Sequence, residues 1–118
     1  MKNRPFYRRL SFALIGLSEA WRRERSFRTQ AVIGAVAVMV TAALKPGLVW
    51  AALVAISISF VLAFELMNSA IECMIDHLHP NIAPQIKLAK DVAAAAVLVA
   101  CIGALSIGAL LAIAWLGS

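Results

Sequence analysis

A stretch of 25 residues, from Val92 to Leu116, contains no charged side chain. A helix that spans a bilayer needs about 20 predominantly apolar residues, so this stretch predicts a complete span. Residues 48–64 form a second apolar run, and residues 31–44 form a third that reaches spanning length with its flanks. The chain has 118 residues, 63% of them hydrophobic and 14% charged, which leaves no room for a separate water-soluble catalytic domain. We therefore predict an all-α integral membrane protein with one domain over residues 1–118.

The expected elements are an N-terminal amphipathic surface helix at about residues 5–26 and three spans at about 28–45, 48–76 and 86–116. In the first segment, apolar side chains recur every three or four residues among arginines, a pattern typical of a helix lying in the membrane surface; they are Phe6, Leu10, Leu14, Leu17 and Trp21. Lys45-Pro46-Gly47 predicts a tight turn between the first two spans, and Pro80 and Pro84 predict a loop before the third.

Basic residues are distributed unequally between the two predicted sides of the membrane. Ten of the eleven lysines and arginines fall in the N-terminal segment and the region of residues 77–91, and only Lys45 lies on the other side. The positive-inside rule then places the N-terminus in the cytoplasm and the C-terminus outside.

The most informative polar stretch is residues 65–76, which continues the second span without Pro or Gly. Glu65, Asn68, Glu72 and Asp76 lie at i, i+3, i+7 and i+11, so their side chains share one side of a helix. One explanation is that a helix becomes polar where it enters water, which accounts well for Asp76 and tolerably for Glu72. It accounts less well for Glu65 and Asn68, because a carboxylate at full depth in hydrocarbon costs about 2.5–3.5 kcal/mol. We interpret this face as a candidate site.

Glu24, Lys90 and Asp91 are expected on the same side of the membrane as this acidic face. Carboxylates can hold Mg²⁺ against phosphate oxygens, a further carboxylate can accept a proton from a hydroxyl, and a lysine can stabilise a transferred phosphoryl group. Neither a Gly-x-x-x-x-Gly-Lys-Ser/Thr stretch nor a Gly-x-Gly-x-x-Gly loop occurs in the sequence. The residues alone therefore indicate cation-assisted chemistry at a membrane face, without identifying the nucleotide.

Residues 65–76, ELMNSAIECMID, resemble the signature of the prokaryotic diacylglycerol kinase family, which includes undecaprenol kinases. Two further blocks agree with that family in order and spacing: residues 12–28, from FALIGL to AWRRERSFR, and residues 89–98, AKDVAAAAVL. The resemblance covers nearly the whole chain. It implies an ATP- and Mg²⁺-dependent lipid kinase of the bacterial inner membrane, with its active site on the cytoplasmic face and with three subunits sharing sites. No nucleic-acid partner is expected.

The resemblance also implies a role for each candidate residue. Glu65 corresponds to the general base for the lipid hydroxyl, and Glu24 and Glu72 to the ligands of the divalent cation. The residues implied to bind or orient ATP are Asn68, Lys90 and Asp91. Pro5 and Ala83 stand where some members carry a basic residue and a histidine, so Arg4, Arg8 or His79 are candidates for the nucleotide contacts that those residues make.

Two substrates and two other classes of protein remain as alternatives. Asn68-Ser69 favours diacylglycerol as the lipid, whereas Glu24-Arg25 and His79-Pro80 are similar to the undecaprenol kinases. A small multidrug transporter is also short and carries a membrane glutamate, but it is expected to have four spans and a lone buried acid. A holin-like membrane protein gives no reason for Glu65, Asn68 and Glu72 to share a face opposite Lys90.

Overall fold

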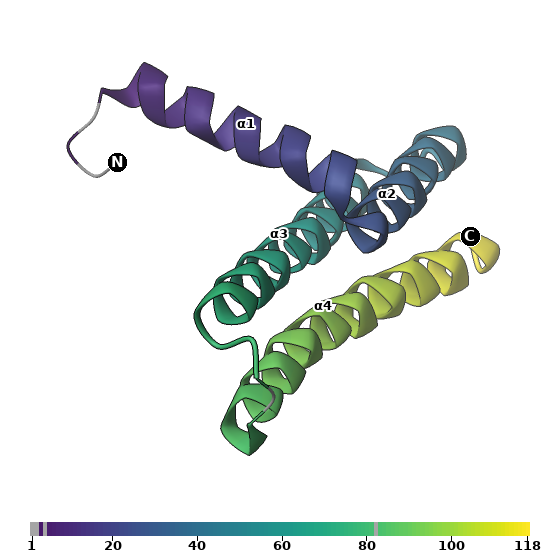
Figure 1. Ribbon diagram of the computed structural model, residues 1–118. Coiled ribbons are helices and arrows are strands. Elements are labelled where there is room, and N and C mark those ends of the chain that lie inside the picture. Colours follow the sequence, from purple (N-terminus) through teal and green to yellow (C-terminus); the bar gives the residue numbers. More distant parts are fainter. Residues whose placement is uncertain (1–2, 4, 82) are drawn as a thin grey trace.

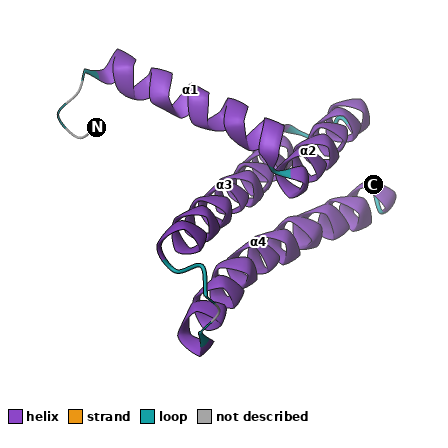
Figure 2. Ribbon diagram, viewed as in Figure 1, coloured by secondary structure: helices purple, strands orange, loops and turns teal. Residues whose placement is uncertain are grey.

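A computed structural model describes residues 3, 5–81 and 83–118 of the chain, and within this part every regular element is a helix (Figures 1 and 2). The helices are α1 (Phe6–Arg23), α2 (Arg25–Leu44), α3 (Leu48–Leu78) and α4 (Pro84–Leu116). Three of them, α2, α3 and α4, are long and apolar enough to cross a membrane. The predicted all-α class with three potential spans is thus confirmed.

Helices α2 and α3 form an antiparallel hairpin whose turn is set by three residues. Lys45 ends α2 in the left-handed conformation (φ 49°), Pro46 follows, and Gly47 has φ 110°, which a side chain would disfavour. Along the hairpin the two helices approach closely at Gly34, where an added Cβ would lie 2.7 Å from Cγ2 of Ile58. The missing side chain of Gly34 therefore allows α2 and α3 to approach closely at this point.

Helix α4 packs mainly against α3 and contacts α2 at separate points. Near the N-terminal end of α2, Gln30 Nε2 lies 3.6 Å from Cys101 Sγ, and at its C-terminal end Trp115 Nε1 donates to the carbonyl of Leu44 at 3.2 Å. An apolar cavity of about 660 Å³ separates the three helices between these contacts. Only Leu111 of α4 is buried, so a single chain leaves most of this helix exposed.

Helix α1 leaves the bundle and projects away from it (Figure 1). It contacts α2 at its C-terminal end, while its apolar side chains, including Phe6, Leu14 and Trp21, are exposed. Its N-terminal end begins after Pro5, whose carbonyl accepts the amides of Arg8 and Arg9. The helix is present where the sequence predicts one, and its position on a membrane surface stays a prediction.

The boundary between α1 and α2 lies at Glu24, a few residues before the expected position. Glu24 has an extended backbone (φ −104°, ψ 103°), and α2 begins immediately after it. No Gly or Pro marks this break, so the sequence pattern does not locate it. At the other end of the bundle the α3–α4 loop is shorter than the predicted residues 77–85, because α3 continues to Leu78 and Pro84 already occupies the first position of α4.

Candidate functional site

The polar face of α3 passes from a buried to an exposed environment along the helix. The Glu65 residue is 5% exposed, Asn68 and Glu72 are half-buried, and the Asp76 side chain is 63% exposed. Glu72 lies seven positions after Glu65, which corresponds to roughly 10 Å along a helix axis. The four side chains therefore form a ladder that connects the interior of the bundle with its surface.

Glu65 is satisfied at the buried end of this ladder by a side chain from another helix. Ser26, the second residue of α2, donates its hydroxyl to Glu65 Oε2 at 2.6 Å. No second hydrogen bond to the Glu65 carboxylate occurs among the residues that the structure describes. One turn along α3, Asn68 Oδ1 is buried and has no hydrogen-bond partner within the same described residues. The second oxygen of Glu65 and the buried Oδ1 of Asn68 are therefore available as acceptors at this level.

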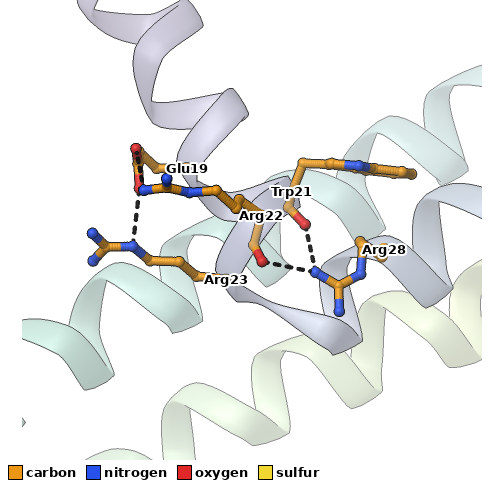
Figure 3. A network of polar contacts seen from close by, with 5 residues as sticks. All are labelled: Glu19, Trp21, Arg22, Arg23 and Arg28. Atoms are coloured by element: carbon orange, nitrogen blue, oxygen red, sulfur yellow. Dashed lines mark hydrogen bonds and ion pairs between the residues drawn. The ribbon is translucent and has the colours of Figure 1, made fainter.

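The α1–α2 break, where Glu24 lies, is capped by the side chain of Arg28. Arg28 Nη1, from the first turn of α2, donates to the carbonyl of Trp21 at 2.7 Å and to that of Arg22 at 3.0 Å (Figure 3). Both carbonyls belong to the last turn of α1 and have no partner within that helix. Arg28 thus turns back onto α1. It thereby fixes the bend at which the half-buried Glu24 lies.

The other acid of this segment, Glu19, is already paired. Arg22 Nη2 lies 2.8 Å from one of its oxygens, and Arg23 Nε lies 2.9 Å from the other (Figure 3). The hydrogen bond from Arg22 lowers the pKa of the Glu19 carboxyl below its ordinary value, and the charges of Arg22 and Arg23 act in the same direction. Glu24 therefore remains the available carboxylate of the α1–α2 segment.

At the exposed end of the ladder, Lys90 joins α4 to α3. Its Nζ lies 2.7 Å from Asp76 Oδ1, and Glu72 lies within electrostatic range of the same ammonium. This arrangement gives Asp76, whose role the sequence left open, a partner. Asp91 is oriented differently, because its carboxylate pairs with Lys87 one turn earlier on α4 at 2.7 Å.

Not all of the predicted site residues meet in one chain. Arg8 is exposed and lies on the N-terminal half of α1, which projects away from the other helices (Figure 1). His79 is exposed at the end of α3. Lys2 and Arg4 lie outside the described residues. The structure thus brings together Glu65 with Ser26, and Lys90 with Asp76 and Glu72, and leaves Arg8 apart.

The acidic residues fit a divalent cation that arrives with phosphates better than one that is permanently bound. Within the described part of the chain, no group of three or more His, Cys, Asp or Glu side chains is placed to hold a metal. Mg²⁺ in kinases typically needs only one or two carboxylates, because substrate phosphates and water supply the other ligands. Glu24 and Glu72 are both half-buried, and neither carboxylate forms a hydrogen bond within the described residues.

Two residues of this arrangement were missed by reading the sequence. Ser26 and Arg28 lie in a basic segment where they resemble other surface residues, and their partners become clear only when α2 is placed beside α3 and bent away from α1. The one available signal was their closeness to Glu24, which already stood out as an acid among arginines.

Comparison with known proteins agrees with the sequence resemblance. Residues 11–112 match the family model described as prokaryotic diacylglycerol kinase. A protein of Escherichia coli (strain K12) named diacylglycerol kinase is 34% identical over 87 residues, which cover 74% of this chain and 71% of that protein. The diacylglycerol kinase of Shigella flexneri gives the same identity and coverage. That of Synechocystis sp. is 32% identical over 98 residues, covering 82% of this chain and 56% of its own.

The Arg28 cap yields a prediction about the α1–α2 bend. Arg28→Gln removes the charged donor from two carbonyls, and we expect it to destabilise the bend by about 1 kcal/mol and to widen the range of α1 orientations. The measurement is the distance between spin labels at Gly16→Cys and Val38→Cys, in a chain without its native cysteines and diluted with unlabelled chain. Arg25→Gln, an exposed neighbour, is the matched control and should leave the distance distribution narrow. An unchanged distribution in Arg28→Gln would show that the cap does not hold the bend.

Proposed function

Since this chain belongs to the prokaryotic diacylglycerol kinase family and is a lipid kinase, we propose that it transfers the γ-phosphoryl group of ATP to the free hydroxyl of diacylglycerol, giving phosphatidic acid and ADP. The observation that carries this proposal is the buried Glu65 carboxylate, which follows the apolar residues 48–64 and accepts one hydrogen bond. Those 17 residues correspond to roughly 25 Å of helix, most of the hydrocarbon thickness of a bilayer. Glu65 thus lies at the level where the headgroup of a lipid begins.

In the proposed reaction Glu65 acts as the general base. Its free oxygen accepts the proton of the lipid hydroxyl while the hydroxyl oxygen forms a bond to the γ-phosphorus of ATP. The bond from that phosphorus to the bridging oxygen breaks, and ADP leaves with the electron pair. Asn68, with its unpaired buried Oδ1, lies one turn away and orients the reacting groups. A general base at the end of a membrane-spanning apolar segment suits an acceptor lipid that cannot leave the membrane.

We assign the phosphates of ATP to the exposed end of the ladder, where Glu72, Asp76 and Lys90 lie. Lys90 supplies positive charge to the transferred phosphoryl group, and Asp76 positions Lys90 through their ion pair. Glu24 and Glu72 would hold Mg²⁺, which would neutralise charge on the phosphates when ATP is bound. Asp91 and Arg8 complete the nucleotide side in this proposal. Arg8 reaches it only if α1 of one subunit lies near the α3–α4 pair of another.

A shared site of this kind implies self-association, which we propose to be trimeric. The exposed apolar side chains of α4, including Leu98, Ile102 and Leu110, offer a surface on which a helix of another subunit could pack in lipid. We further propose that the chain lies in the bacterial inner membrane with its N-terminus and the site on the cytoplasmic side, because ATP is found in the cytoplasm.

Cross-linking in vesicles should yield nothing larger than trimers, and a C-terminal reporter active only in the cytoplasm should stay silent. Dimers alone, or a strong reporter signal, would contradict these two proposals.

The choice of lipid is tested with the purified chain and labelled ATP. Diacylglycerol, undecaprenol and ceramide are presented separately in the same mixed micelles. Diacylglycerol is expected to give a kcat/KM at least about tenfold above the others, because that difference needs only ~1.4 kcal/mol of transition-state discrimination. Undecaprenol kinase activity is the second candidate, favoured by Glu24-Arg25 and His79-Pro80. Faster phosphorylation of undecaprenol would establish it in place of the first.

The roles of the acids are separated by conservative variants. Glu65→Gln keeps the shape of the side chain but removes its proton acceptor, so kcat should fall by about 10²-fold or more with little change in the KM for ATP. Glu24→Gln and Glu72→Gln should instead weaken Mg²⁺-dependent ATP binding, measured directly by titration of the nucleotide. Lys90→Met should impair both kcat and KM. Normal turnover by well-folded Glu65→Gln would exclude the general-base role, and normal Mg²⁺-ATP binding by both other variants would exclude the assigned cation ligands.

A further inference from the structure

The hydrogen bond between Ser26 and Glu65 connects the start of α2 with the buried end of the polar ladder on α3. The two oxygens are 2.6 Å apart, a length typical of a hydroxyl that donates to a carboxylate. The two residues are 39 positions apart in the chain, so the bond exists only because α2 and α3 are paired. It reaches the one carboxylate of the described residues that is buried.

Other hydroxyl groups of the spanning helices behave differently. Thr41, Ser57 and Ser59 each donate to a carbonyl three or four residues earlier in their own helix, at 2.8–2.9 Å. Such bonds satisfy a hydroxyl locally where lipid offers no partner. Among the described residues, Ser26 is the hydroxyl that donates to a side chain of another helix.

The α1–α2 break explains why Ser26 is free to do so. The carbonyl four residues before it is that of Arg22, which lies across the break in α1 and accepts a hydrogen bond from Arg28. Ser26 therefore lacks the usual acceptor within its own helix. Its hydroxyl turns to α3 instead, where Glu65 Oε2 accepts it.

From this arrangement we propose that Ser26 is a positioning residue for Glu65 in the phosphoryl transfer, an inference that rests on the general-base role proposed above. The terminal torsion of a glutamate is broad, so a carboxylate with no fixed partner samples many orientations. Ser26 occupies Oε2 and restricts this rotation. Oε1 is then left in a defined position to accept the proton of the lipid hydroxyl, while Ser26 remains a donor to Oε2 throughout and neither gains nor loses a proton.

The first test removes the hydroxyl and measures steady-state kinetics with labelled ATP and diacylglycerol in mixed micelles. Ser26→Val and Ser26→Thr have nearly the same shape and differ in the hydroxyl. Ser26→Val should lower kcat by about tenfold, the loss expected for a hydrogen bond to a charged group, with both KM values within twofold of the wild type. Ser26→Thr should keep kcat within about threefold. Ser59→Ala, which removes a hydroxyl that bonds its own helix, is the matched control and should leave kcat unchanged.

The second test asks whether Ser26 acts through Glu65. In a chain that already carries Glu65→Gln, adding Ser26→Val should change the residual kcat by less than twofold, because the carboxylate that Ser26 orients is gone. A general structural effect would lower kcat by the same factor in both backgrounds, and that result would overturn the proposal. Equal kcat for Ser26→Val and Ser26→Thr would overturn it as well.

These outcomes are separable from a failure of the proposed function. If Glu65→Gln alone retained normal turnover, the general-base role would fall and the positioning role with it. If Glu65→Gln were impaired and Ser26→Val were normal, the proposed function would stand and the role of Ser26 alone would be excluded. Thermal inactivation of each variant in the same micelles identifies any loss of fold, and Ser26→Thr retains the hydroxyl if Ser26→Val proves unstable.

Discussion

Hydrocarbon offers no hydrogen-bond partners, and the rest of this structure depends on that constraint. Each backbone amide and carbonyl at membrane depth must be satisfied inside its own segment, which leaves the helix as the form that α2, α3 and α4 can take. The same constraint turns the hydroxyls of Thr41, Ser57 and Ser59 back onto their own helices. Where a polar group cannot be satisfied locally, it must find a partner on a neighbouring helix, and the candidate site lies at such a place.

The α1–α2 break connects the membrane constraint with the proposed chemistry. The end of a helix leaves carbonyls without partners, and Arg28 satisfies two of those at the end of α1. The bend places Glu24 between two helices and deprives Ser26 of an acceptor in its own helix. Both consequences bring polar groups toward α3, so one unsatisfied helix end organises the α2 side of the site.

The polar face of α3 offers one end to a lipid substrate and the other end to a water-soluble substrate. In the proposed reaction the acceptor hydroxyl arrives from the bilayer, whereas the triphosphate arrives from water. Glu65 lies at the buried end of the face and the Lys90–Asp76 pair lies at its exposed end, with Glu72 near the ammonium. The proposed reaction needs the two substrates to meet between these levels. Asn68 lies there with an unpaired buried oxygen, and the proposed reaction uses it to align the two substrates.

The sequence alone determined the features that depend on local physics. The length of an apolar run predicts a span, Lys45-Pro46-Gly47 predicts a turn, and the spacing of Glu65, Asn68, Glu72 and Asp76 places them on one side of a helix. Each of these follows from distances along the chain. The family resemblance added the expected roles of Glu24 and Lys90, because it compares blocks of residues whose order and spacing are specific.

The tertiary structure decided which of these groups meet. Ser26 and Glu65 are 39 residues apart, and no periodicity in either segment relates them. The break at Glu24 is stabilised by Arg28 from the next helix, so it carries no Gly or Pro signal, and the partner of Asp76 was fixed only when α4 packed beside α3. Arg8 remained apart from the other candidates because α1 projects away from the bundle (Figure 1). Helices can be predicted from neighbours in sequence, but contacts between them depend on how those helices bend and pack.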